Sequence, residues 1–396
     1  MTTLGLPVPN PAIIAWARQD SGHTPERAAQ RLRIPVDRLL AWEQGRRQPT
    51  LKRLERLAGF LRRPLSVFFQ DAPPRLPPLA AEYRRLPGVR PGAESPELRL
   101  ALRQMINRRE RALDLSAELD AEPPSLSLRA HHREAVPTVA ARLRSALGIR
   151  DADQRAWRDG WRAWRQWRGA VEDLGVLVFQ FPGVALDEVR GLCLLHQPLP
   201  VIGINSKEGS PEARRFTLIH ELTHLALANG GDEAPALRDA HDEPGWQDLE
   251  RFAERVASHT ILPASMLDDL LIEAAPTAFD VPTVRTLARR SGLTPLAVAT
   301  RLWDDGHLEA SAYRAWRQSW DQWLADHPPR GGGFATPDQQ ALGRNGRPFV
   351  RLVFDALSQN RITATDAARY LDIRYQHFQK LTQRLIGPVD LGGGDA

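Results

Sequence analysis

Residues 211–230, PEARRFTLIHELTHLALANG, predict one long helix. Ser210 precedes the segment as a helix cap, and Pro211 suits the first helical turn. No helix breaker follows until the Asn-Gly-Gly run at 229–231, which favours a helix end. Within this helix lies the pentapeptide His-Glu-Leu-Thr-His, residues 220–224.

The spacing of the two histidines suits metal binding. His220 and His224 are four residues apart, so both imidazoles project from one face of the helix and can reach a single ion. Glu221 lies close enough to act on a water bound to that ion. The motif therefore predicts a catalytic Zn²⁺ site with Glu221 as the general base.

A catalytic zinc site needs a third protein ligand. A longer motif with glycine at 227 and histidine at 230 is absent, because Leu227 and Gly230 stand there. The helical segment that ends before Pro263 offers Glu250, which we expect to be the third ligand. Acidic and histidine residues of the intervening loop are rivals for this position: Asp232, Glu233, Asp239, His241, Asp242 and Glu243.

Two further roles near the metal can be assigned provisionally. Glu254 is one helical turn beyond Glu250 and could hold a ligating histidine by accepting a hydrogen bond, although an exposed surface charge explains it equally well. His259 and His241 are within sequence reach as donors to a developing oxyanion. An ordinary structural role explains each of these histidines at least as well.

The flanking sequence indicates an α+β fold that is predominantly α. Short apolar runs at 175–183, 189–196 and 199–206, bounded by Gly and Pro, predict a small β-sheet just before the metal-binding helix. Helical patterns cover about 97–119, 134–147 and most of 211–325.

Three linked segments resemble the ImmA/IrrE-type metallopeptidases: PVIGINS at 200–206, RRFTLIHELTHLAL at 214–227, and the E-x-x-A-E-x-V-A-x-x-T-I-L-P array at 250–263. The resemblance covers roughly 140–325. It implies a zincin-like peptidase core in which His220, His224 and Glu250 bind zinc and Glu221 is the general base. The family usually has Asn and Phe where this chain has Glu254 and Val256.

Composition narrows the class of protein. The chain has 396 residues, a formal net charge of +5 and one cysteine, so an internal disulfide and Cys-rich zinc sites are excluded. No apolar run is long enough to span a membrane, and the N-terminus lacks the pattern of a secretion signal. We therefore expect a cytoplasmic protein with no membrane partner.

Residues 10–70 resemble an XRE-type helix-turn-helix domain. Thr24-Pro25-Glu26 opens the second helix, Ile34-Pro35 makes the turn, and the segment WEQGRRQPT follows at 42–50. Residues 1–71 carry twelve basic against six acidic residues, so a polyanionic partner should meet this part of the chain first.

The recognition helix offers little for reading bases. Arg38 is its one strong candidate for a base or phosphate contact, and Asp37 would repel phosphate. Other basic residues that could bind phosphates are Arg46, Arg47, Lys52 and Arg53. Docking onto another protein explains this surface as well as binding to DNA does.

An arginine- and tryptophan-rich stretch covers 153–173, where four tryptophans recur on one face of an expected helix: Trp157, Trp161, Trp164 and Trp167. Such a helix could stack on single-stranded nucleic acid. A core-facing aromatic stripe with solvated arginines is the simpler interpretation.

These patterns predict six segments along the chain. They are a helix-turn-helix domain (1–71), a linker and helical connector (72–133), the peptidase domain (134–326), a linker (327–345), a helical unit (346–388) and a disordered tail (389–396). Segments 284–302 and 362–385 also have a weak helix-turn-helix rhythm.

The sequence thus predicts a cytoplasmic zinc endopeptidase that controls gene expression by cleaving a repressor or another partner protein, in stress response, mobile-element control or defence. The chain could also act as a homodimer. The alternative is a DNA-binding regulator, or an antitoxin-like protein, in which the metal site is sensory or structural.

Overall fold

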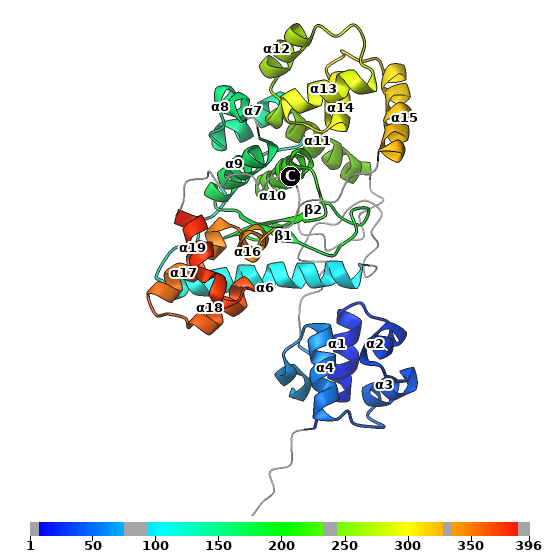
Figure 1. The fold of residues 1–396 in the computed structure, drawn as a ribbon, viewed down its shortest axis with the longest axis vertical. Helices are drawn as coiled ribbons and strands as arrows, with labels where there is room; N and C mark the ends of the chain where they lie inside the picture. Colours follow the sequence, from blue (N-terminus) through cyan, green and yellow to red (C-terminus); the bar gives the residue numbers. More distant parts are fainter. Residues whose placement is uncertain (1–7, 75–93, 158, 233–243, 328–334, 387–396) are drawn as a thin grey trace, which may run out of the picture. The chain divides into compact units, whose positions relative to one another are not determined.

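The computed structural model describes residues 8–74, 94–157, 159–232, 244–327 and 335–386. These residues fall into two compact units, one made of 1–81 and 89–104 and the other of 82–88 and 105–396. Helices dominate both units, and a small sheet lies in the second one (Figure 1). The predicted fold class, predominantly α with a small β-sheet, is confirmed.

The first unit is a helical bundle that contains a helix-turn-helix. Its elements are α1 (Pro11–Asp20), α2 (Pro25–Leu32), α3 (Val36–Glu43), α4 (Leu51–Leu61) and the 3-10 helix η1 (Leu65–Phe69). The hydroxyl of Thr24 caps α2, and Arg33 ends it in the left-handed conformation with φ of 56°. Arg18 of α1 donates two hydrogen bonds, of 2.6 and 2.9 Å, to Glu43 at the end of α3. This buried pair fixes α3 against α1.

Helix α6 (Pro96–Glu118) belongs to both units. In the first unit, Arg103 of this helix approaches Asp20 at 3.6 Å. In the second unit, Arg109 donates hydrogen bonds of 3.0 and 2.8 Å to the carbonyls of Leu199 and Pro198. Within the described part of the predicted connector (72–133), residues 96–118 thus form one continuous helix.

The sheet of the second unit has three strands in the order β1-β3-β2. β1 (Leu177–Phe181) is parallel to β3 (Val201–Asn205), and β2 (Gly191–Leu194) is antiparallel to β3. All three strands lie where the sequence predicts them. Helix α6 passes along one face of the sheet and α10 (Pro211–Gly230) along the other (Figure 1).

Helices before and after the sheet complete the core around α10. They are α7 (Val136–Ala146), α8 (Asp151–Ala156), α9 (Gly160–Asp173), α11 (Pro244–Ile261), α12 (Ala264–Ala274), α13 (Val281–Ser291), α14 (Pro295–Asp304) and α15 (Ala310–Asp326). α9 and α11 both pack against α10. The core is thus centred on the helix that carries the His-Glu-Leu-Thr-His motif.

The tryptophan-rich stretch is divided between two helices, contrary to the single helix expected over 153–173. α8 ends at Ala156, and Asp159 caps α9 by accepting hydrogen bonds from the backbone amides of Trp161 and Arg162. A strong capping residue followed by Gly160 starts a new helix at this point. Trp164 and Trp167 are buried in the core, as the core interpretation predicts, whereas Trp161 of the same stripe is 41% exposed.

The C-terminal helices are α16 (Pro337–Asn345), α17 (Arg347–Ser358), α18 (Ala364–Leu371), η3 (Tyr375–His377) and α19 (Phe378–Ile386). α16 occupies much of the stretch expected as a linker (327–345), because Thr336 and Gln339 form a capping box at its start. It packs against β1, and Arg168 donates a 3.1 Å hydrogen bond to the carbonyl of Gly343. Gly346 approaches Val178 so closely that a Cβ would lie 2.8 Å from its carbonyl oxygen.

Candidate metal centre

Helix α10 holds its two histidines in a buried position. Ser210 caps the helix by accepting a hydrogen bond from the amide of Ala213, and Gly231 ends it with φ of 89°. Both ends are thus as the sequence predicts. His224 has no exposed surface, and the His220 side chain is 13% exposed. An imidazole buried this fully requires polar partners or a metal.

The side chain of Glu250 in α11 meets these two imidazoles. The Nε2 atoms of His220 and His224 are 3.1 Å apart. The Glu250 carboxylate lies 3.4 Å from the first and 3.6 Å from the second. Three candidate donor atoms, two nitrogens and one oxygen, therefore converge from two helices.

The spacing of these donors fits a tetrahedral metal ion. Donors bound at about 2.0–2.2 Å to one tetrahedral ion lie roughly 3.4 Å from each other. The two imidazole nitrogens are 3.1 Å apart, Glu250 Oε2 is 3.4 Å from His220, and Glu250 Oε1 is 3.6 Å from His224, so each separation falls around that value. Two imidazoles and one carboxylate also form a ligand set that leaves a fourth position for water or substrate. The residues present thus fit zinc.

The side chain of Glu221 is also buried, between α10 and the sheet. Its side chain packs at the start of β2, where a Cβ on Gly191 would lie 2.9 Å from Glu221 Oε1 and 2.3 Å from Thr217 Cγ2. The residue is 5% exposed. Because Gly191 has no side chain, it leaves space for the Glu221 carboxylate. Gly191 was not among the residues predicted from the sequence, although a glycine at the start of a buried strand can indicate such a close approach.

The far end of α11 is anchored by three buried side chains. The carbonyl of Thr260 accepts a 2.9 Å hydrogen bond from Arg144, and that of Ile261 accepts one of 2.8 Å from Gln154. The next carbonyl, of Leu262, accepts a 3.0 Å bond from Arg301. Carbonyls at a helix end lack partners within the helix, so these contacts stabilise α11 and hence the position of Glu250.

The other candidates for the site lie elsewhere or outside the described residues. Asp232 accepts hydrogen bonds from the backbone amide and the imidazole of His132, at 2.6 and 2.9 Å. The remaining loop candidates, including the possible oxyanion donor His241, lie outside the described residues: Glu233, Asp239, His241, Asp242 and Glu243.

Glu254 and His259, both on α11, lie near charged residues at the end of α14. Burial of its carboxyl and repulsion from Asp304 raise the pKa of Glu254, while its side chain retains an exposed portion. The supporting role of Glu254 toward a histidine remains a prediction. His259 lies 3.8 Å from Asp305. Burial and the nearby Arg301 lower the pKa of His259 to about 4.

Most of the basic residues predicted to contact DNA or a partner are on the surface of the helix-turn-helix unit. Arg46, Arg47 and Lys52 are exposed, whereas Arg38 and Arg53 are partly buried. Trp42 is buried at 2% exposure, so the aromatic residue of the motif belongs to the core. The unit thus presents positive charge after α3 and at the start of α4.

Comparison with known proteins assigns two parts of the chain. Residues 171–302 match the model of the IrrE N-terminal-like domain, and this range includes all four residues of the proposed centre. The chain contains an IrrE-like peptidase domain. Residues 14–68 match a helix-turn-helix model, which precedes the IrrE-like domain.

The IrrE-like domain also has a curated relative. The chain is 40% identical over 98 residues to the radiation response metalloprotease IrrE of Deinococcus deserti. The match covers 24% of this chain and 32% of that protein, about a third of its length. Among the described residues, no helix is sufficiently long and apolar to cross a membrane.

Proposed function

We propose that the chain is a zinc-dependent endopeptidase in which His220, His224 and Glu250 bind the ion. The observation that carries the proposal is the convergence of two imidazole nitrogens, 3.1 Å apart, and one carboxylate whose oxygens lie 3.4 and 3.6 Å from them, distances that suit ligands of one tetrahedral ion. The match to an IrrE-like peptidase domain supports the same conclusion. When bound, zinc would polarise the scissile carbonyl and lower the pKa of a coordinated water.

Glu221 would be the general base. It follows His220 directly on α10, and its burial keeps the carboxylate in a fixed position between α10 and β2. From there it would accept a proton from the attacking water and deliver it to the departing amine of the substrate. We further propose that the substrate main chain lies extended along β2, the outer strand nearest this carboxylate.

The helix-turn-helix unit would bring the peptidase to its target. We propose that the target is a repressor or a related regulator, so that cleavage changes gene expression, as in stress response, mobile-element control or defence. The radiation response named for the relative supports such a role. A protein acting on DNA-bound regulators would work in the cytoplasm, alone or as a homodimer.

The test is a comparison of newly formed protein N-termini in cells that express the wild-type chain or Glu221→Gln. Removing the general base should lower cleavage by about 10²–10⁴-fold while zinc content stays at one ion per chain. Cleavage products that appear equally with both proteins would contradict the proposal. Zinc content measured on the purified proteins separates loss of chemistry from loss of the ion.

A second function is favoured by the exposed basic side chains of the helix-turn-helix unit. In this alternative the chain is a DNA-binding regulator, and its metal site senses or stabilises. Glu221→Gln would then leave regulation of the target gene intact, whereas substitution of Arg46 and Arg47 would abolish it. The endopeptidase predicts that Glu221→Gln alone abolishes regulation.

A further inference from the structure

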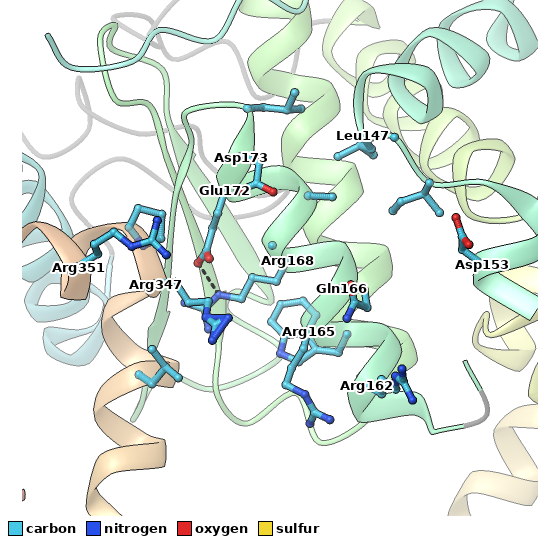
Figure 2. A pocket seen from close by; sticks show the side chains of 18 of the residues that line it. Leu147, Asp153, Arg162, Arg165, Gln166, Arg168, Glu172, Asp173, Arg347 and Arg351 are labelled. Carbon is cyan, nitrogen blue, oxygen red and sulfur yellow. Dashed lines mark hydrogen bonds and ion pairs between the residues drawn. The ribbon is translucent and has the colours of Figure 1, made fainter. Parts of the chain in front are cut away.

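A cavity of about 1150 Å³ lies between the peptidase core and the C-terminal helices (Figure 2). Helix α9 and the segment that precedes it line one side, and α17 lines the other. None of the residues of the metal centre contributes to its lining. A cavity of this volume can enclose a small molecule, since ligand pockets typically measure about 300–1,000 Å³.

The lining of this cavity is rich in arginine. Arginines outnumber carboxylates by six to four. Figure 2 shows Arg165 on one side and Arg347 and Arg351 on the other, with the Arg168–Glu172 pair between them. The six arginines are Arg162, Arg165, Arg168, Arg347, Arg351 and Arg384.

Two of the four carboxylates are already neutralised by arginines. Glu172 accepts a 2.8 Å hydrogen bond from Arg168, and this pair is buried. Asp153 is bound at 2.7 Å by Arg150. The remaining carboxylates of the lining are Asp173, which is exposed, and Asp355. The positive charge of the cavity is therefore only partly compensated.

Several of the arginines have donors to spare. Across the described parts of the chain, no carboxylate lies within 4.0 Å of the guanidinium groups of Arg162, Arg347 or Arg351, although Arg347 donates a 2.8 Å hydrogen bond to the carbonyl of Arg384. Arg165 reaches Asp159 at only 3.7 Å, and its side chain is 38% exposed. Charge-assisted donors of this kind bind anionic groups well.

The end of the cavity away from α17 combines apolar side chains with Asp153, which is paired with Arg150. Figure 2 shows Leu147 there, well separated from Arg347 and Arg351. Ile149 and Trp157, whose side chain is partly buried, lie close to Leu147 in the sequence and also line the cavity. A planar ring could pack here while an anionic group meets the arginines.

We propose that this cavity binds a nucleotide. Its phosphates would contact Arg165, Arg347 and Arg351, which face one another across the cavity, and its base would pack near Trp157. Guanidinium groups suit phosphate because they present several donors in a fixed plane. Since the arginines come from both α9 and α17, a bound nucleotide would join the peptidase core to the C-terminal helices.

The test is calorimetric titration of the full chain with ATP, GTP, CTP and UTP, each in turn. At least one nucleotide should bind saturably, and more tightly than either its nucleoside or pyrophosphate. Equal affinity for pyrophosphate would overturn the role of the base, and equal affinity for the nucleoside would overturn the role of the arginines. Absence of saturable binding by all four nucleotides would overturn the proposal.

The matched variants are Arg351→Gln and, as control, Arg289→Gln. Both residues are exposed and lack a carboxylate partner among the described residues, so both proteins should fold, as circular dichroism would verify. Arg351→Gln should weaken nucleotide binding by about tenfold, because a charge-assisted contact is lost. The control should change nothing. Equal weakening by both variants would indicate non-specific attraction and reject the site.

Discussion

Helices α10 and α3 are the functional helices of the two matched domains, and they differ in what they expose. α10 buries eleven of its residues, including Glu221 and His224. α3 buries two, Leu39 and Trp42. The metal centre is therefore a feature of the core, whereas any recognition by the helix-turn-helix occurs at the surface.

This contrast decides how each helix responds to substitution. Groups on α10 act through position, which depends on packing with β2 and α11. The basic groups that follow α3 act through charge in water, where salt screens them. Substitutions at the metal centre should therefore have large and salt-independent effects, and substitutions at the recognition surface should have small and salt-dependent ones.

The largest effect should follow from Glu250→Gln. Losing an anionic ligand should lower zinc affinity by more than about 100-fold, above the range seen when only a supporting residue is removed. Competition with a chelating dye would measure it. Asp232→Asn is the matched control, because that carboxylate contacts His132 instead of the centre. A larger loss with Asp232→Asn would reassign the third ligand.

Arg301→Met should lower the free energy of unfolding by about 2–3 kcal/mol, because it leaves a buried carbonyl and Asp305 without their partner. Arg301 is 1% exposed and binds Asp305 at 2.7 Å. Urea titration of the zinc-loaded protein would measure the change. Arg314→Met, at an exposed position on α15, should shift stability by less than about 0.5 kcal/mol. Equal changes in the free energy of unfolding of both variants would mean that Arg301 does not stabilise the end of α11.

Gly191→Ala should lower kcat about tenfold, because the added methyl group would lie 2.3 Å from Thr217 Cγ2 and 2.9 Å from Glu221 Oε1 and would displace both side chains of α10. Cleavage of a peptide substrate and zinc titration would be measured together. Gly209→Ala is a suitable control, because a Cβ there meets no atom closer than 4.0 Å. Unchanged kcat in Gly191→Ala would show that Glu221 does not require this space.

The smallest effect should come from Arg46→Gln combined with Arg47→Gln. If the unit binds DNA, losing two phosphate contacts should weaken binding by about fivefold and reduce the salt slope by about 2. Fluorescence anisotropy at several salt concentrations would measure both. Arg374→Gln with Lys380→Gln removes the same charge from the C-terminal helices and should leave binding unchanged. An equal loss of binding in that variant would mean that DNA binding does not depend specifically on the helix-turn-helix unit.

Much of the fold could be predicted from local patterns. The helix carrying His220 and His224 has a capping serine, an initial proline and a terminal glycine, so its limits were readable. Glu250 could be proposed because the second helix and the family resemblance both indicated it. Contacts between distant segments could not be predicted: Gly191 touching Glu221, and Arg301 reaching the end of α11.

The local pattern of helices and caps also does not reveal which surfaces a segment buries. Thr24 and Thr363 both cap eight-residue helices, which end in left-handed Arg33 and Asp372. The sequence therefore predicts a similar turn in both places. In the second case, however, the preceding helix α17 packs against α9 and forms one wall of an arginine-lined cavity. Which surface a small helical unit buries depends on partners far away in the chain.

Helix α11 is anchored at its C-terminal end and carries its metal ligand about three turns earlier. The carbonyl contacts fix residues 260–262, and between them and Glu250 the side chains of Phe252, Val256 and Ala257 are buried in the core. The helix also packs against α7 and α10. An ion shared with α10 would therefore add one more link to a helix that packing already holds, so zinc starvation should silence the chemistry and spare the scaffold.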